Sequence, residues 1–405
     1  VLAIFCINWF QFGCTKYKAC RQPPDMSQLK KASDSVNNLC LKLYAKLTED
    51  GSQESNVFFS PASISVALAM IYAGTKGNAE KEIEQLFNWD SPDIVHEMME
   101  QLQESILSSS GIELHLANRL WAQKGFAILT QYTNLLKSRY QVEMGAVDFL
   151  RKSEEARKAI NQWVEEKTNA KIKDMLDSGA VRPDTKVVLV NAVYFKGLWE
   201  EEFLKEHSVD WDFKISTSIT CKVTLMNKTA HFMYAKCEQL ACQMVKLKYK
   251  QSDLAMMIFL PDEVDGLPEL VKKFDVAQLN KCNTTLSNTK LRVSIPKFTA
   301  DSKFRLNHVL GKLGVSSVFS SQDADLSGVT GNKDLYITEA IHQAFVDVNE
   351  QGTEAAAATA MIFAPTCIML PPPHFLADHP FLFFIQHAQS GAILFAGKIA
   401  KPENK

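Results

Sequence analysis

The chain has 405 residues, of which 46% are hydrophobic and 22% are charged, a composition typical of a globular protein with a large core. With 44 basic and 46 acidic residues the formal net charge is −2, and without a long basic run we expect no nucleic-acid partner. The nine cysteines show no paired CxxC spacing, which argues against a zinc site of that type and favours free thiols in a reducing compartment over a disulfide framework.

The N-terminal residues 1–25 differ from the rest of the chain. They open with VLAIFCINWFQF, an apolar run of signal-peptide length without a basic region before it, which is too short to span a bilayer. We interpret 1–25 as an extension, either the end of a truncated signal or an artefact upstream of a start at Met26, and we favour the second. No linker rich in Pro, Gly or Ser divides residues 26–405, so we predict a single domain there.

Helices dominate the first part of the domain. Residues 28–48 carry leucines and valines at spacings that suit a helix packed on one side. Val57 to Phe59 read as a short buried strand, after which Ser60 caps a helix, Pro61 occupies its first turn and Gly74 closes it. This helix is apolar on most faces, so we expect it at the centre of the fold.

Further elements alternate up to residue 199. We predict helices from about residue 78, at 92–108, at 128–139 and at 153–169, and strands at 112–123, at 141–148 and from Thr185 to about Trp199. The helix at 92–108 has an acidic polar face with Glu97, Glu100 and Glu104, and it contains no Lys or Arg.

Strands dominate the second part. Short strands are predicted in WDFKIS, ITCKVTLMN, MVKLKY, LAMMIFLP, LRVSIPKFTA, FLFFIQH and ILFAGKI, with another between Leu335 and Val348. Helices are predicted at about 266–280 and from Lys303 to Leu313. Early helices and late strands favour an α+β fold with large mixed or antiparallel sheets.

The stretch after Val348 is unusual because its residues are almost all small. Between Gly352 and Ala360 it contains one charge, Glu354, and the prolines from Pro365 to Pro373 would end any helix. Read with period two, one face carries Thr353, Ala355, Ala357, Thr359, Met361 and Phe363, and the other carries Glu354, Ala356, Ala358, Ala360, Ile362 and Ala364. We infer an element that is a loop in one state and a strand in another.

Four segments together resemble the serpin family: NVFFSPASISVALAMIYAGTKGNAEKEI, VLVNAVYFKGLWEEEF, VNEQGTEAAAATA and FLADHPFLFFI. The resemblance covers about residues 27–400, and the last three segments are similar to the ovalbumin-like, mainly intracellular branch near the leukocyte elastase inhibitors. It implies three β-sheets, about nine helices and an exposed reactive loop after a central strand.

The resemblance also implies a mechanism. A serine protease attacks the loop, an acyl-enzyme forms, and the loop enters the main sheet as a new strand before deacylation, so that the protease stays covalently trapped. The residues implied for the hinge of the loop are Glu350, Gly352, Thr353, Glu354, Ala355, Ala356, Ala357 and Ala358. Because bulk or charge facing inward would slow insertion, the small hinge residues favour an inhibitor; a non-inhibitory serpin that binds or stores is the alternative.

The position of the scissile bond depends on how the loop is counted. From the hinge glycine the scissile residue is Thr366, and from the DHPF motif it is Cys367. A trypsin-like protease requires Lys or Arg, and none occurs between Gly352 and Pro373. We therefore expect elastase-like or chymotrypsin-like targets, with a cysteine protease as a further possibility.

Other residues match family positions. Ser60, Ser63, Asn191 and His342 match the shutter, where strands of the main sheet part, and Trp199 matches the breach at the top of the sheet. Glu350 matches the acidic residue that starts the hinge, with a solvated charge as the alternative.

No GxSxG, HExxH or P-loop motif occurs, so we expect no enzymatic activity, metal or cofactor. Heparin activation is not expected, because the helix at 92–108 lacks basic residues. We expect a monomer without a membrane partner, acting in the cytoplasm, with an extracellular location as the alternative.

Overall fold

A computed structural model describes residues 26–49, 54–89, 92–108, 110–351 and 371–403. Within them lie ten α-helices: α1 (Met26–Glu49), α2 (Pro61–Tyr72), α3 (Gly77–Phe87), α4 (Pro92–Leu107), α5 (Thr130–Tyr140), α6 (Phe149–Lys167), α7 (Leu267–Lys273), α8 (Val276–Thr285), α9 (Leu306–Lys312) and α10 (Ser327–Thr330). The extension 1–25, and hence its interpretation, lies outside the described residues. No helix in the described part is long and apolar enough to cross a membrane.

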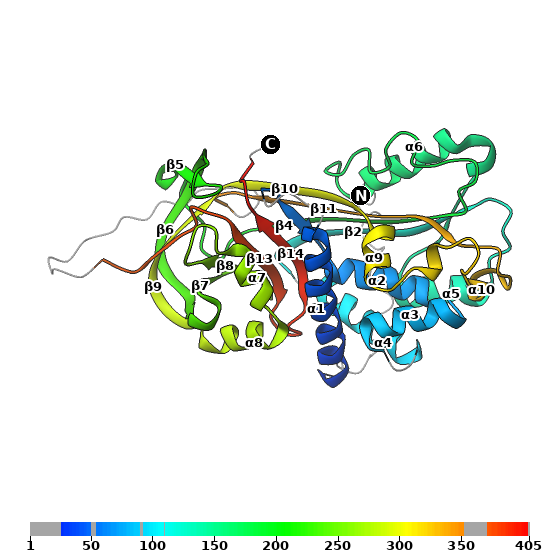
Figure 1. The fold of residues 1–405 in the computed structure, drawn as a ribbon, viewed down its shortest axis with the longest axis horizontal. Coiled ribbons are helices and arrows are strands. Elements are labelled where there is room, and N and C mark those ends of the chain that lie inside the picture. The colour runs from blue at the N-terminus through cyan, green and yellow to red at the C-terminus, as the bar shows by residue number, and fades with distance from the viewer. Residues whose placement is uncertain (1–25, 50–53, 90–91, 109, 352–370, 404–405) are drawn as a thin grey trace, which may run out of the picture.

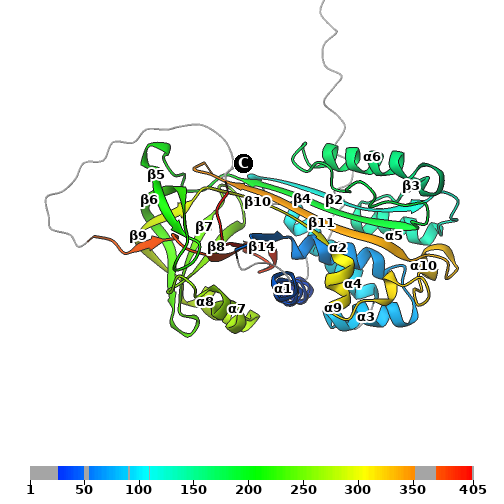
Figure 2. The same ribbon diagram turned by 45° about the horizontal axis from the view of Figure 1, so that its top comes forward.

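Five strands form the central sheet, in the order β10-β11-β4-β2-β3. Their bounds are β2 (Ile112–Gln123), β3 (Gly145–Val147), β4 (Val187–Gly197), β10 (Phe298–Arg305) and β11 (Ile337–Val348). In Figures 1 and 2, α6 covers one face of this sheet, and α2 lies with the other early helices on the opposite face.

A second sheet has nine strands, in the order β1-β14-β13-β8-β7-β6-β9-β12, with β5 paired to β6. They are β1 (Val57–Phe59), β5 (Val209–Lys214), β6 (Thr220–Cys237), β7 (Cys242–Lys248), β8 (Leu254–Pro261), β9 (Ser287–Pro296), β12 (His374–Leu376), β13 (Phe381–His387) and β14 (Ile393–Ile399). Three sheets were expected, but the described residues form two hydrogen-bonded sheets because the 18-residue strand β6 pairs with β5, β9 and β7 in turn.

The alternation of side chains along β4 builds two cores. Leu189 and Val193 face the larger core, which also contains α2 and residues of the nine-stranded sheet. Val188 and Val190 face a smaller core under α6. Because β4 is covered on both faces, its sequence is a nearly continuous apolar run, as expected for a buried central strand.

Two elements that the sequence predicts as continuous are each divided in the structure. The helix predicted at 266–280 is broken at Phe274, whose backbone is extended, and α8 restarts after Asp275, which accepts a hydrogen bond from Gln278 N at 2.6 Å. The single strand predicted in LRVSIPKFTA is two strands, because β9 pairs with β6 and β10 pairs with β11. As a result, β10 extends to Arg305 and the following helix begins at Leu306 instead of Lys303.

Candidate functional site

The central feature of the site is a seam between two parallel strands. β11 runs beside β4 in parallel, with His342 paired to Asn191 and Val346 paired to Phe195. The chain leaves β11 at Val348, is described up to Gln351 and is described again from residue 371, just before β12. A segment that turned back from the end of β11 into this seam would run antiparallel to both neighbours, so it could form a ladder on each side.

Buried polar residues lie across the seam at the level of α2. The side chains of Asn191 and His342 hydrogen-bond to each other through Oδ1 and Nδ1. Ser60 N donates to His342 Nε2 at 3.0 Å, and Asn191 Nδ2 donates to Ser63 Oγ at 2.8 Å. The structure thus brings together the four residues predicted for the shutter, and ties the two strands to the N-terminus of α2.

The sequence did not point to Asn118, a fifth member of this cluster. It lies opposite Asn191 in the β2–β4 ladder. Its Oδ1 accepts hydrogen bonds from Asn191 Nδ2 and from Ser63 Oγ, the latter at 3.1 Å. Asn118 is a buried polar residue in the predicted strand IELHLANRLWAQ, but its partner could be identified only from the strand register.

The hydrogen bonds determine the protonation of His342. Since Nε2 accepts from the Ser60 N–H, the imidazole proton is on Nδ1 and points to Asn191 Oδ1. His342 is fully buried. Burial lowers its pKa to about 3, although a hydrogen bond with Asn191 opposes the shift.

We therefore expect acid to destabilise the fold through His342. Its pKa is about 3 in the folded state and about 6.5 when unfolded, so the unfolded state binds the extra proton between these values and stability falls as pH falls through that window. Between pH 7 and pH 5 the loss from this group amounts to about 2 kcal/mol. Urea unfolding of wild type and His342→Gln at both pH values measures it; equal losses in the two proteins would contradict the prediction.

Trp199 holds the end of β11 from which the loop departs. It is buried, its Nε1 donates to Asn349 O at 3.0 Å and its backbone N donates to Gln351 O at 3.1 Å. The indole stacks on Tyr249 at a centroid distance of 4.7 Å. Trp199 therefore connects the end of β4 to the last described residues before the loop, where the breach was predicted.

Glu350 is buried, not solvated, so the alternative of a solvated charge is wrong. Its side chain is 5% exposed; Oε2 lies 3.1 Å from Lys297 Nζ, and Ser208 Oγ donates to Oε1 at 3.0 Å. Burial alone would raise its pKa, but hydrogen bonds from its own backbone, Lys297 and Ser208 outweigh burial and lower it. Phe203 N also donates to Glu350 O at 2.8 Å, so the start of the loop is held on both side chain and backbone.

The other predicted loop residues lie outside the described residues. They are Gly352, Thr353, Glu354, Ala355, Ala356, Ala357, Ala358, Thr366 and Cys367. Their roles in the hinge and at the reactive bond remain predictions.

Two of the acidic residues predicted on the polar face of α4 differ in burial. Glu97 is exposed, whereas Glu100 is buried and forms an ion pair with Arg139 of α5. Glu100 is therefore part of the packing between α4 and α5. As predicted from the sequence, α4 contains no Lys or Arg.

The sequence and the fold are similar to those of known proteins. Residues 34–402 match the family model described as serpin (serine protease inhibitor). The chain is 39% identical to leukocyte elastase inhibitor A of Rattus norvegicus, covering 91% of this chain and 99% of the relative. It is 38% identical to leukocyte elastase inhibitor of Homo sapiens, covering 92% and 100%.

Solved structures agree with this. Uncleaved ovalbumin matches with a TM-score of 0.83 and 29% identity, covering 92% of this chain and 100% of that chain. Human thyroxine-binding globulin complexed with thyroxine matches with a TM-score of 0.85 and 26% identity, covering 93% and 100%. The chain belongs to the serpin family.

Proposed function

We propose that this protein is a suicide-substrate inhibitor of serine proteases. The observation that carries the proposal is the parallel pair β4–β11, because the small residues from Gly352 onward follow shortly after the C-terminal end of β11 in the sequence. A strand entering this seam replaces one parallel ladder by two antiparallel ladders. The inserted state therefore has more main-chain hydrogen bonds than the starting state, which favours insertion once the loop is cut.

The reaction starts as ordinary proteolysis. The protease serine Oγ forms a bond to the scissile carbonyl carbon, the peptide C–N bond breaks, and the new amine takes the proton that the serine hydroxyl loses. The C-terminal fragment remains packed in the nine-stranded sheet through the buried strands β13 and β14. An acyl-enzyme joins the protease to the loop. If insertion carries the protease away and distorts its active site before water attacks the ester, the complex persists.

We propose elastase-like or chymotrypsin-like proteases as targets, with cleavage after Thr366 or Cys367. The loop between Gly352 and Pro373 contains no Lys or Arg to reach a carboxylate in a trypsin-like pocket. Relatives named leukocyte elastase inhibitor support this choice. A cysteine protease remains a second target class.

Incubation with pancreatic elastase tests the proposal. We expect an SDS-stable complex whose mass is about the sum of protease and inhibitor, because the ester survives denaturation. Mass spectrometry of the C-terminal fragment, which denaturation separates from the complex, should place the cut after Thr366 or Cys367. If elastase, chymotrypsin and papain all cleave the protein without forming a complex, the protein is instead a non-inhibitory serpin with a binding or storage role. Papain tests only the second target class, so the main proposal does not require a complex with papain.

We further propose that the protein acts in the cytoplasm as a monomer. Support comes from the cysteines in the described part of the chain, of which Cys40, Cys221, Cys237, Cys242 and Cys282 are free. Free thiols are usual in reducing compartments. Cell fractionation tests the location, and an extracellular protein would contradict it.

A further inference from the structure

The segment that joins α6 to β4, residues 168–184, covers the seam. Its apolar residues Ile172, Met175 and Leu176 are buried in the small core together with Val190 of β4 and Ile341 of β11. Val190 and Ile341 are register partners on opposite sides of the seam. The segment therefore packs on both strands that a new strand would have to separate.

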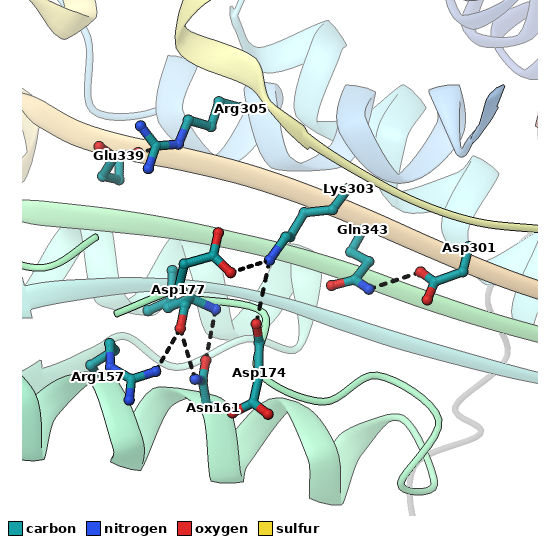
Figure 3. A network of polar contacts seen from close by, with 10 residues as sticks. Arg157, Asn161, Asp174, Asp177, Asp301, Lys303, Arg305, Glu339 and Gln343 are labelled. Atoms are coloured by element: carbon teal, nitrogen blue, oxygen red, sulfur yellow. Dashed lines mark hydrogen bonds and ion pairs between the residues drawn. The ribbon is translucent and has the colours of Figure 1, made fainter. Parts of the chain in front are cut away.

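Polar contacts attach this segment firmly to α6. Asn161 Nδ2 donates to Leu176 O at 3.0 Å, and Leu176 N donates back to Asn161 Oδ1 at 2.8 Å. Arg157 Nη1 donates to the same carbonyl at 2.7 Å. Figure 3 shows Arg157 and Asn161 directed from α6 toward this part of the segment. We therefore treat α6 and residues 168–184 as one unit.

The same segment is tied to the strand on the far side of β11. Lys303 of β10 forms an ion pair with Asp177, with Nζ 2.7 Å from Oδ1, and Nζ also donates to Asp174 O at 3.4 Å. In Figure 3, Lys303 points from β10 toward Asp177 and Asp174 above α6. Because β11 separates β10 from β4, these contacts extend across the seam.

Insertion must stretch this connection. A new strand separates β4 from β11 by an additional spacing of about 4.8 Å, and β10 moves with β11 because the two are paired from Phe298 to Arg305. A segment held by α6 on one side cannot keep a 2.7 Å contact with Lys303 on the other. We propose that the pair between Lys303 and Asp177 is a latch that opens before the strand enters and that slows insertion.

The proposed latch depends on the loop insertion proposed above, and it would be one of the contacts that set the rate of insertion. After cleavage, insertion competes with hydrolysis of the acyl-enzyme, so a slower insertion raises the share of inhibitor cut without trapping. The Lys303 and Asp177 side chains are 32% and 66% exposed, and exposed ion pairs contribute little. We therefore expect opening the latch to accelerate insertion about two- to fivefold.

The test uses a peptide instead of a protease. A fluorescent synthetic peptide with the sequence of residues 352–363 is mixed with the full-length protein, and its uptake is followed over time on native gels. We expect faster uptake, by about two- to fivefold, in Lys303→Met and in Asp177→Asn. The reversed pair Lys303→Asp with Asp177→Lys should return the rate toward that of wild type.

Lys137→Met provides the matched control. Lys137 of α5 forms an exposed pair with Glu143, at 3.2 Å, away from the seam, so its removal should leave uptake unchanged. Uptake at the wild-type rate in both Lys303→Met and Asp177→Asn would overturn the latch while leaving the proposed function in place. Failure of every variant and of wild type to take up peptide would overturn the latch together with loop insertion.

Discussion

Thr353→Arg is expected to convert the inhibitor into a substrate. Thr353 belongs to a face of the hinge that otherwise carries alanines and threonines near its start, and a strand entering between β4 and β11 has packed cores on both faces. An arginine placed there would be buried without a partner, at a cost of several kcal/mol. Since each 1.36 kcal/mol on a barrier is tenfold in rate, insertion should slow by about 100-fold or more.

Hydrolysis of the acyl-enzyme should then be faster than insertion. We expect elastase to cleave Thr353→Arg completely while forming little SDS-stable complex, with the initial cleavage rate close to that of wild type. Thr353→Ser, which keeps a small side chain, serves as the control and should inhibit as wild type does. Unchanged trapping by Thr353→Arg would show that this residue does not enter the sheet.

Among the variants proposed for this protein, Trp199→Ala is expected to lower the free energy of unfolding most. It removes a buried indole, its stacking on Tyr249 and its hydrogen bond to Asn349 O, and truncation of a buried tryptophan costs about 3–5 kcal/mol. Urea unfolding followed by far-UV circular dichroism measures the change without relying on tryptophan fluorescence.

Trp199→Phe separates the packing of the indole from its hydrogen bond. The variant keeps an aromatic ring against Tyr249 but leaves Asn349 O without the indole N–H, so we expect a loss of about 1–3 kcal/mol. Equal unfolding midpoints for Trp199→Ala and wild type would refute a structural role for this residue at the end of β11.

Local sequence patterns were sufficient to predict many of the helices and strands. The amphipathic spacing of residues 28–48 predicted α1, and Ser60 followed by Pro61 predicted the start of α2, where Ser60 Oγ accepts from Ser63 N at 3.1 Å. Such features depend on neighbours three or four residues apart. The sequence could not divide β9 from β10, because their different partners, β6 and β11, are decided by contacts between distant segments.

In the candidate site, too, some features could be predicted from the sequence and others depend on contacts between distant segments. The residues predicted for the shutter and the breach came from the family resemblance, and the structure shows the contacts that they make. Asn118 was missed because it reaches Asn191 only through the β2–β4 register, and the burial of Glu350 depends on Lys297, which is far from it in sequence. A buried carboxylate and a solvated one look identical in the sequence.

The sequence by itself determined that the segment from Thr353 to Ala360 consists almost entirely of small residues on both faces of a possible strand, because side-chain size and the alternation of faces are properties of consecutive residues. It also excluded a basic scissile residue between Gly352 and Pro373. Only the tertiary structure decided which two strands form the proposed entry seam and which contacts cross it. β10 and β11 are distant in the chain from β4 and from the segment between α6 and β4. The parallel pairing of β11 with β4 and the contact of Lys303 with Asp177 arise only when these segments pack together.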